Sequence, residues 1–177
     1  MKYLIFILVV IGLQGCTTPA VVSKADADMT QRAMAFEVEK DIAKVYFVNG
    51  KILENMFNMK HQYPSDFIVD GKTIGSKNKE DALVFKVKPG KYDFSWNVRS
   101  TDPIDKNANP QIMSVILQGG EILVLQGDYS LGGAAMFGLI GGMVSPPKTW
   151  LKRAERSEIQ GKTIVMPQNC DVKVCLK

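Results

Sequence analysis

The chain has 177 residues, of which 46% are hydrophobic and 23% charged, and this balance is typical of a soluble globular protein. It excludes bulk disorder, a long coiled coil and a polytopic membrane protein. If residues 1–15 are a removable leader, the remaining 162 residues suffice for one domain and are too few for a multidomain machine. Their 21 Lys plus Arg against 18 Asp plus Glu give a formal +3, too little to indicate a nucleic-acid partner.

The N-terminus has the pattern of a secretory leader. Lys2 precedes an apolar run over residues 3–13, which is shorter than the roughly 20 residues that a transmembrane helix needs. The sequence Leu-Gln-Gly-Cys that ends at Cys16 resembles the bacterial lipobox. That resemblance implies cleavage before Cys16, a diacylglyceryl group on its thiol and acylation of the new amine, a strong lipid anchor. The alternative is a plain cleaved signal followed by a chance cysteine.

Residues after the anchor predict where the domain is held. Thr17 stands where an aspartate is associated with retention in the inner membrane, so we expect attachment to the outer membrane, facing the periplasm. Residues 16–28 are mostly small and polar and are interpreted as a lipidated, disordered tether. A single folded domain is then predicted over residues 29–177.

Two further cysteines, Cys170 and Cys175, lie near the C-terminus, and an envelope compartment favours disulfides. Five steps along a straight strand cover roughly 16 Å, whereas bridged Cα atoms lie about 4.4 to 6.8 Å apart. A disulfide therefore requires residues 171–174 to turn back. We favour a small terminal loop closed by this disulfide, with free thiols or a metal site as alternatives.

Residues 29–38 have helical spacing of apolar positions behind Asp28 as an N-cap, so we expect a short helix there. The pattern then changes to period two. A strand is predicted over residues 43–48, and the Asp70-Gly71 pair predicts a tight hairpin between strands at 67–69 and 73–74.

Two more hairpins are predicted further along the chain. Residues 82–87 and 92–98 flank Pro89-Gly90, and residues 111–117 and 122–126 flank Gly119-Gly120. The segment between the two hairpins is a polar loop. Five or six strands with hairpin connections and little helix indicate an antiparallel β-sandwich, because each sheet must bury one face against another layer.

Few residues suggest catalysis. His61 is the single histidine and lies in a loop-like stretch, with no nucleophile elbow elsewhere. The carboxylate pairs Glu80-Asp81 and Asp102 with Asp105 could serve a glycosidase, but they stand where Asp and Glu favour turns. We predict no catalytic, metal or cofactor site. An envelope glycan-binding protein or hydrolase that uses Asp102, Asp105 and surface aromatics is the alternative.

Two groups of side chains are interpreted as structural. Tyr92, Phe94 and Trp96 alternate with polar residues, which favours a buried sheet face over a platform for sugar rings. A basic group near Trp150 is interpreted as a solvated face, although it could also contact anionic headgroups or a partner. It comprises Lys148, Lys152, Arg153 and Arg156.

Residues 129–144 form the most unusual segment, sixteen residues with five glycines and no charge. Small residues recur there at a four-residue spacing that allows close helix approach in membranes. Packing over the sandwich is one interpretation, and contact with a partner or a membrane is the other. The contact residues would be Gly133, Ala134, Phe137, Gly138, Leu139 and Gly142.

The motif Val69-Asp70-Gly71-Lys72, with Ile74-Gly75 and the turn at residues 89–92, is similar to the lipoprotein family called domain of unknown function 2846 and to PEGA-type modules. The resemblance covers residues 42–130 and rests on turn chemistry. It implies a transthyretin-like or immunoglobulin-like β-sandwich and carries no catalytic residues. We therefore expect a non-catalytic, lipid-anchored binding or scaffolding module with an envelope protein as partner and no cofactor.

Overall fold

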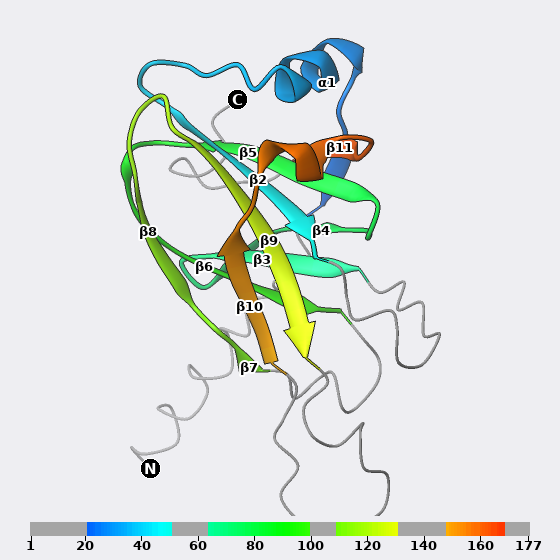
Figure 1. Ribbon diagram of the computed structural model, residues 1–177, viewed down its shortest axis with the longest axis vertical. Helices are drawn as coiled ribbons and strands as arrows, with labels where there is room; N and C mark the ends of the chain where they lie inside the picture. The colour runs from blue at the N-terminus through cyan, green and yellow to red at the C-terminus, as the bar shows by residue number, and fades with distance from the viewer. Residues whose placement is uncertain (1–20, 51–63, 100–108, 131–147, 169–177) are drawn as a thin grey trace, which may run out of the picture.

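A computed structural model describes residues 21–50, 64–99, 109–130 and 148–168, which form two β-sheets, an α-helix and a short 3-10 helix (Figure 1). The larger sheet has the order β1 (Val22–Lys24), β11 (Thr163–Pro167), β5 (Asp81–Val87), β2 (Ala43–Asn49), β9 (Ile122–Ser130), β10 (Lys148–Arg153) and β7 (Asn109–Pro110). The smaller sheet has the order β4 (Lys72–Lys77), β3 (Ser65–Val69), β6 (Gly90–Val98) and β8 (Met113–Leu117). The prediction of a mainly β sandwich with a short N-terminal helix is confirmed.

The main core lies between the two sheets and is rich in aromatic rings. The ring centroids of Phe47 and Phe67 are 4.4 Å apart, and Phe94 is 5.8 Å from Phe67. Trp96 joins the layers, because its Nε1 donates to the carbonyl of Trp150 at 2.8 Å. Gly127 on β9 faces this indole, and a Cβ there would lie 2.6 Å from Trp96, so only glycine fits.

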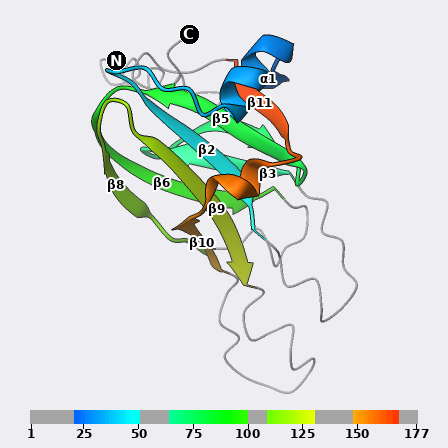
Figure 2. The ribbon, with the colours of Figure 1, turned by 45° about the horizontal axis from the view of Figure 1, so that its top comes forward.

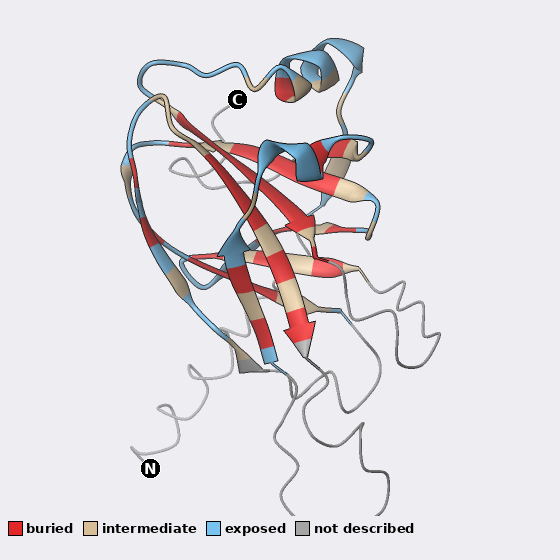
Figure 3. Ribbon diagram, in the orientation of Figure 1, coloured by how far each residue is buried: buried red, intermediate tan, exposed pale blue. Residues whose placement is uncertain are grey.

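A second core covers the outer face of the larger sheet, where α1 (Ala27–Met34) and η2 (Arg156–Ile159) pack (Figure 2). Tyr46 of β2 donates its hydroxyl hydrogen to the Ala33 carbonyl at 2.8 Å, and Ile159 is fully buried. Burial is concentrated on the central strands, whereas α1 and η2 expose their outer sides (Figure 3). Strand β2 is therefore buried on both faces.

Strand pairing is only partly antiparallel, which corrects the prediction of an antiparallel sandwich throughout. The described smaller sheet is antiparallel, but in the larger sheet β2 pairs with β9, β5 with β11 and β10 with β7 in parallel. Parallel neighbours need connections that leave the sheet. Here the chain between β2 and β9 passes through the smaller sheet, which makes the parallel pair geometrically accessible.

One of the three predicted hairpins is correct. Asp70 and Gly71 have φ of 49° and 77°, and they join β3 to its neighbour β4 as the type I′ turn requires. The turns at Pro89-Gly90 and Gly119-Gly120 instead cross from one sheet to the other, because β5 and β9 belong to the larger sheet and β6 and β8 to the smaller. Alternation in the sequence indicates which face of a strand is buried. A hairpin within one sheet and a turn that crosses between the two sheets bury the same faces, so alternation does not distinguish them.

The N-terminal boundary of the domain also differs from prediction. The tether prediction for residues 16–28 is wrong beyond residue 21, because Val22–Lys24 pairs with β11. Helix α1 begins at Ala27, and its N-cap is Asp26, whose carboxylate accepts from the Met29 N–H at 2.8 Å. Val22 packs on the main core, and this contact secures a segment whose composition alone is that of a linker.

The C-terminal half contains strands that periodicity did not indicate. The predicted strand at 122–126 continues to Ser130, so buried Tyr129 belongs to β9 and not to the glycine-rich segment. Strands β10 and β11 were not predicted. Neither sequence alternates with period two: β10 buries the polar Thr149 and ends in two charged residues, and β11 is apolar at four of its five positions.

Candidate binding cleft

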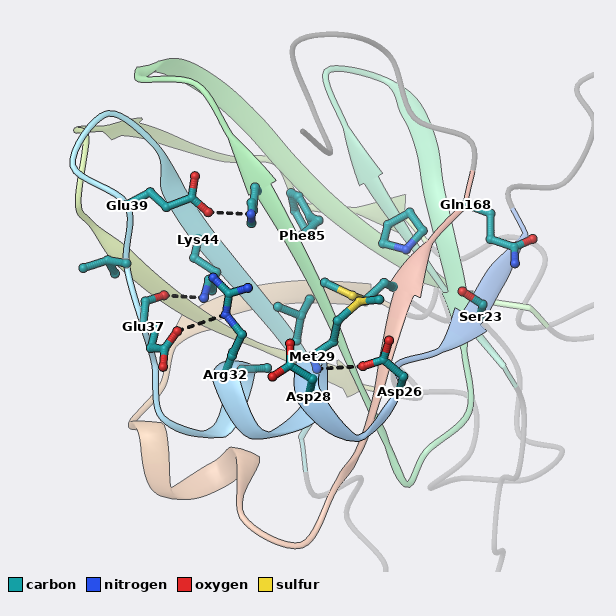
Figure 4. Close-up of a pocket in the computed structure, with 16 residues that line it drawn as sticks. Ser23, Asp26, Asp28, Met29, Arg32, Glu37, Glu39, Lys44, Phe85 and Gln168 are labelled. Carbon is teal, nitrogen blue, oxygen red and sulfur yellow. Dashed lines mark hydrogen bonds and ion pairs between the residues drawn. The ribbon is translucent and has the colours of Figure 1, made fainter. Parts of the chain in front are cut away.

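A cleft of about 830 Å³ lies between α1, the segment that follows it and the outer face of the larger sheet. Its floor is formed by residues of β2, β5, β11 and β1, and the wall includes Met29 and Arg32 of α1 and the segment 37–39 (Figure 4). Sites for small ligands typically measure roughly 300–1,000 Å³. The cleft has the size of a binding site.

Local structure explains why the cleft exists. The helix ends at Met34, and Phe36 adopts a φ of 52°, which turns the chain away from the helix axis. The Phe36 ring then packs against Tyr46 at 5.0 Å between centroids. Residues 37–39, which follow this turn, line the cleft together with Lys44 of β2 and Lys86 of β5.

Apolar side chains line the cleft on α1, on the segment that follows it and on the floor. Met29 of α1 and Val38 of the segment that follows are 45% and 46% exposed, while Val84 and Met166 belong to the strands of the floor. Exposed apolar side chains that line one cleft can accept an apolar group of a ligand.

The three cations of the cleft have partners within its lining. Its lining contains four carboxylates (Asp26, Asp28, Glu37 and Glu39) and three cations (Arg32, Lys44 and Lys86). Arg32 Nε lies 3.1 Å from Glu37 Oε2, Lys86 pairs with Glu39, and Lys44 Nζ donates to the Glu37 carbonyl. Each cation contacts the segment 37–39. These contacts connect the segment to α1 through Arg32 and to the larger sheet through Lys44 and Lys86.

The electrostatics follow from these contacts. Burial is the main cause that lowers the pKa of Lys44, and the nearby charge of Lys86 lowers it further. The hydrogen bond from Lys86 lowers the pKa of Glu39, so that carboxylate stays ionised around neutral pH. Among the described residues that line the cleft, Ser23 is the sole hydroxyl, and no histidine or cysteine lines it. The arrangement is suited to binding by shape and charge.

Most side chains predicted to contact a partner or to be modified lie outside the described residues. These are Cys16, His61, Asp102, Asp105, Gly133, Ala134, Phe137, Gly138, Leu139, Gly142, Cys170 and Cys175.

The aromatic and acidic groups behave as the sequence indicates. Tyr92, Phe94 and Trp96 are at most 5% exposed and belong to the main core, so they form no surface platform for sugars. The Asp81 carboxylate accepts from the Asn78 N–H at 3.0 Å, and Glu80 is an exposed side chain. This pair performs the turn role expected of it.

The basic group near Trp150 does not gather into one cationic patch. Lys152 pairs with Asp128 at 2.8 Å, Arg153 lies 3.9 Å from Glu121, and Arg156 lies over the Phe36 ring at 5.1 Å. The described contacts of these side chains are consistent with a solvated face.

Sequence reasoning missed the cleft itself. Its residues come from positions 23–44, 84–86 and 166–168, which are distant along the chain. The available signals were the charged residues around Val38 in the segment 37–40, at the end of a helical pattern, and the apolar Met29 near its start. Neither feature points to a cavity without knowledge of which strands lie beneath the helix.

Comparison with protein-family models, curated proteins and solved structures gave no match for this chain. The resemblance in turn motifs therefore stays a prediction. Over the described ranges, no helix has the length and apolar character needed to cross a membrane. The same ranges contain no group of three or more His, Cys, Asp or Glu side chains arranged to hold a metal ion.

Proposed function

We propose that this chain is a non-catalytic, lipid-anchored binding module of the bacterial cell envelope, attached through Cys16 and facing the periplasm. The ligand binds in the cleft between α1 and the larger sheet, and this ligand is a segment of an envelope protein. The observation that carries the proposal is the cleft of about 830 Å³ whose lining includes the exposed apolar side chains of Met29 and Val38.

The chemistry of the cleft favours a protein ligand. A lining that combines apolar side chains with charges of both signs suits a protein ligand, because protein interfaces bury an apolar side chain next to polar groups. The cations are already paired with the wall, which favours an uncharged anchor over a phosphate or a sulfate. The glycine-rich segment, residues 129–144, is proposed as a second contact.

The test places a photoreactive amino acid at Met29 or Val38 of the full-length protein in its membrane. Both positions should give the same protein adduct, identified by mass spectrometry. Thr73, exposed on the smaller sheet, provides the matched control position and should not give it.

A second variant tests the cleft floor. Met166→Glu should reduce the adduct at Met29 at least about tenfold, because a charge would then oppose the apolar anchor. Thr73→Glu adds the same charge elsewhere and should have no effect. An adduct from Thr73 as strong as from Met29, or no protein adduct from Met29 and Val38, would contradict the proposal.

A further inference from the structure

The free edge of β8 differs from the other sheet edges that the structure describes. Exposed edges pair with other chains unless a charge, a proline, a bulge or a very short strand protects them. Edge strand β1 has three residues and ends in Lys24, and edge strand β7 has two residues and contains Pro110. Edge strand β4 contains lysines, and its pairing with β3 is irregular.

Strand β8 has none of these protections. Residues 111–118 contain no charged residue and no proline, and the pairing of β8 with β6 runs without a register shift. β8 lies along one side of the molecule, where β6 is its one partner among the described strands (Figure 1). Ile116 of β8 is 71% exposed, and Ile112, which directly precedes the strand, is 69% exposed. These are the two highest values among the exposed large hydrophobic side chains described.

The spacing of the two isoleucines makes this edge complementary to itself. Ile112 and Ile116 are equidistant from Ser114, so an antiparallel pairing centred on Ser114 places each isoleucine opposite the other one of a second copy. Val115 and Met113 would also lie opposite each other and extend the buried face of both sheets. Directly opposed side chains on paired strands have Cβ atoms about 4.5–5.5 Å apart, which allows contact.

The charges on the neighbouring strand are compatible with this pairing. Lys91 and Asp93 of β6 stand beside Ile116 and Ser114, and Asp93 already accepts a hydrogen bond from the Ser114 hydroxyl. In the paired sheet the two Asp93 side chains would be separated by three strand spacings, about 14 Å, which keeps their repulsion small. The four isoleucines would form an uncharged strip between the charged residues of the two copies.

We infer that β8 is a dimerisation edge at which two copies of this chain pair antiparallel about Ser114. The inference is independent of the cleft and of the ligand proposed for it. The occupant is a second copy because the register, the apolar pairs and the absence of charge are all matched by the same strand turned through a twofold axis.

The full-length protein in detergent micelles provides the test, with its oligomeric state measured by sedimentation velocity. Wild type should be dimeric, and Ile116→Lys should raise the dissociation constant at least about tenfold, because each dimer loses two opposed isoleucine pairs. Thr73→Lys adds the same charge to the outer face at the opposite edge and should leave the dimer intact.

Disulfide trapping tests the register. A mixture of Ile112→Cys and Ile116→Cys should form a covalent dimer under mild oxidation beyond the wild-type background, while either variant alone should form much less. A wild-type monomer overturns the inference, as does a dimer indifferent to Ile116→Lys. Trapping that is strongest with one variant alone would overturn the antiparallel register.

Discussion

Lys77 ends β4 with its ammonium group inside the sandwich. Its side chain is 2% exposed, and its Nζ donates to the Asp81 carbonyl at 2.9 Å and the Asn78 carbonyl at 3.2 Å. The Phe47 ring lies 5.1 Å from the same nitrogen. Burial lowers the pKa of Lys77 from 10.5 to about 7; the charge of Asp81 opposes this shift, and that of Lys162 adds to it.

This burial predicts a pH dependence of stability. Between pH 7 and 10 the unfolded chain holds a proton at Lys77 more often than the folded chain, so the free energy of unfolding should rise with pH, by at most about 1.4 kcal/mol per pH unit. Lys77→Met should flatten the rise between pH 7 and 9, measured by urea unfolding. Lys88→Met removes the same charge from an exposed turn as a control. Equal slopes for both variants would refute the assignment.

At the scale of elements, α1 connects the N-terminal segment to the cleft. The helix has eight residues, too few for stability by itself, so it depends on its cap and on its packing over Tyr46. Asp26 provides the cap and also lines the cleft, while Arg32 of the last turn joins the helix to Glu37. The order of the cleft wall therefore depends on the stability of this helix.

Asp26→Ala should therefore lower the free energy of unfolding by about 0.5–2 kcal/mol, because the Met29 N–H loses its acceptor. Hydrogen exchange should become faster at the amides of residues 27–30 and remain unchanged in β6. Asp26→Asn keeps a capping oxygen and should restore most of the protection. Uniformly faster exchange across the sheets would show that the cap does not act locally.

For the whole molecule, the two sheets and α1 form one folded unit that begins within ten residues after Cys16. The N-terminal strand β1 is part of the larger sheet, which shortens the tether predicted from composition. If Cys16 is the lipid anchor, the domain is held close to the membrane surface by residues 17–21.

We expect Cys16→Ser to release the protein from the membrane fraction or to leave it with an uncleaved leader, because the lipid chains supply the anchoring energy. Fractionation with mass spectrometry of the N-terminal peptide measures this. Cys175→Ser should retain a lipidated N-terminus and membrane attachment. An unmodified Cys16 in the membrane-bound wild type would contradict lipidation.

The amino-acid sequence by itself indicated the strands β2 to β6, β8 and β9 and which of their faces are buried. Val45, Phe47, Phe94 and Trp96 lie in the core because side chains alternate across a strand. It also determined the hairpin at Asp70-Gly71, because that turn is specified by the backbone preferences of its two central residues.

Only the tertiary structure decided which sheet each strand joins and where the cleft lies. The turns at Pro89-Gly90 and Gly119-Gly120 bury the same faces whether they return to one sheet or cross to the other, so alternation cannot distinguish the two outcomes. Strand β11 lies beside β5, although the paired residues are 82 positions apart in the chain, and Met166 of β11 lines the same cleft as Met29 of α1. Such neighbours are selected by packing between distant segments, which leaves no periodic signal in either one.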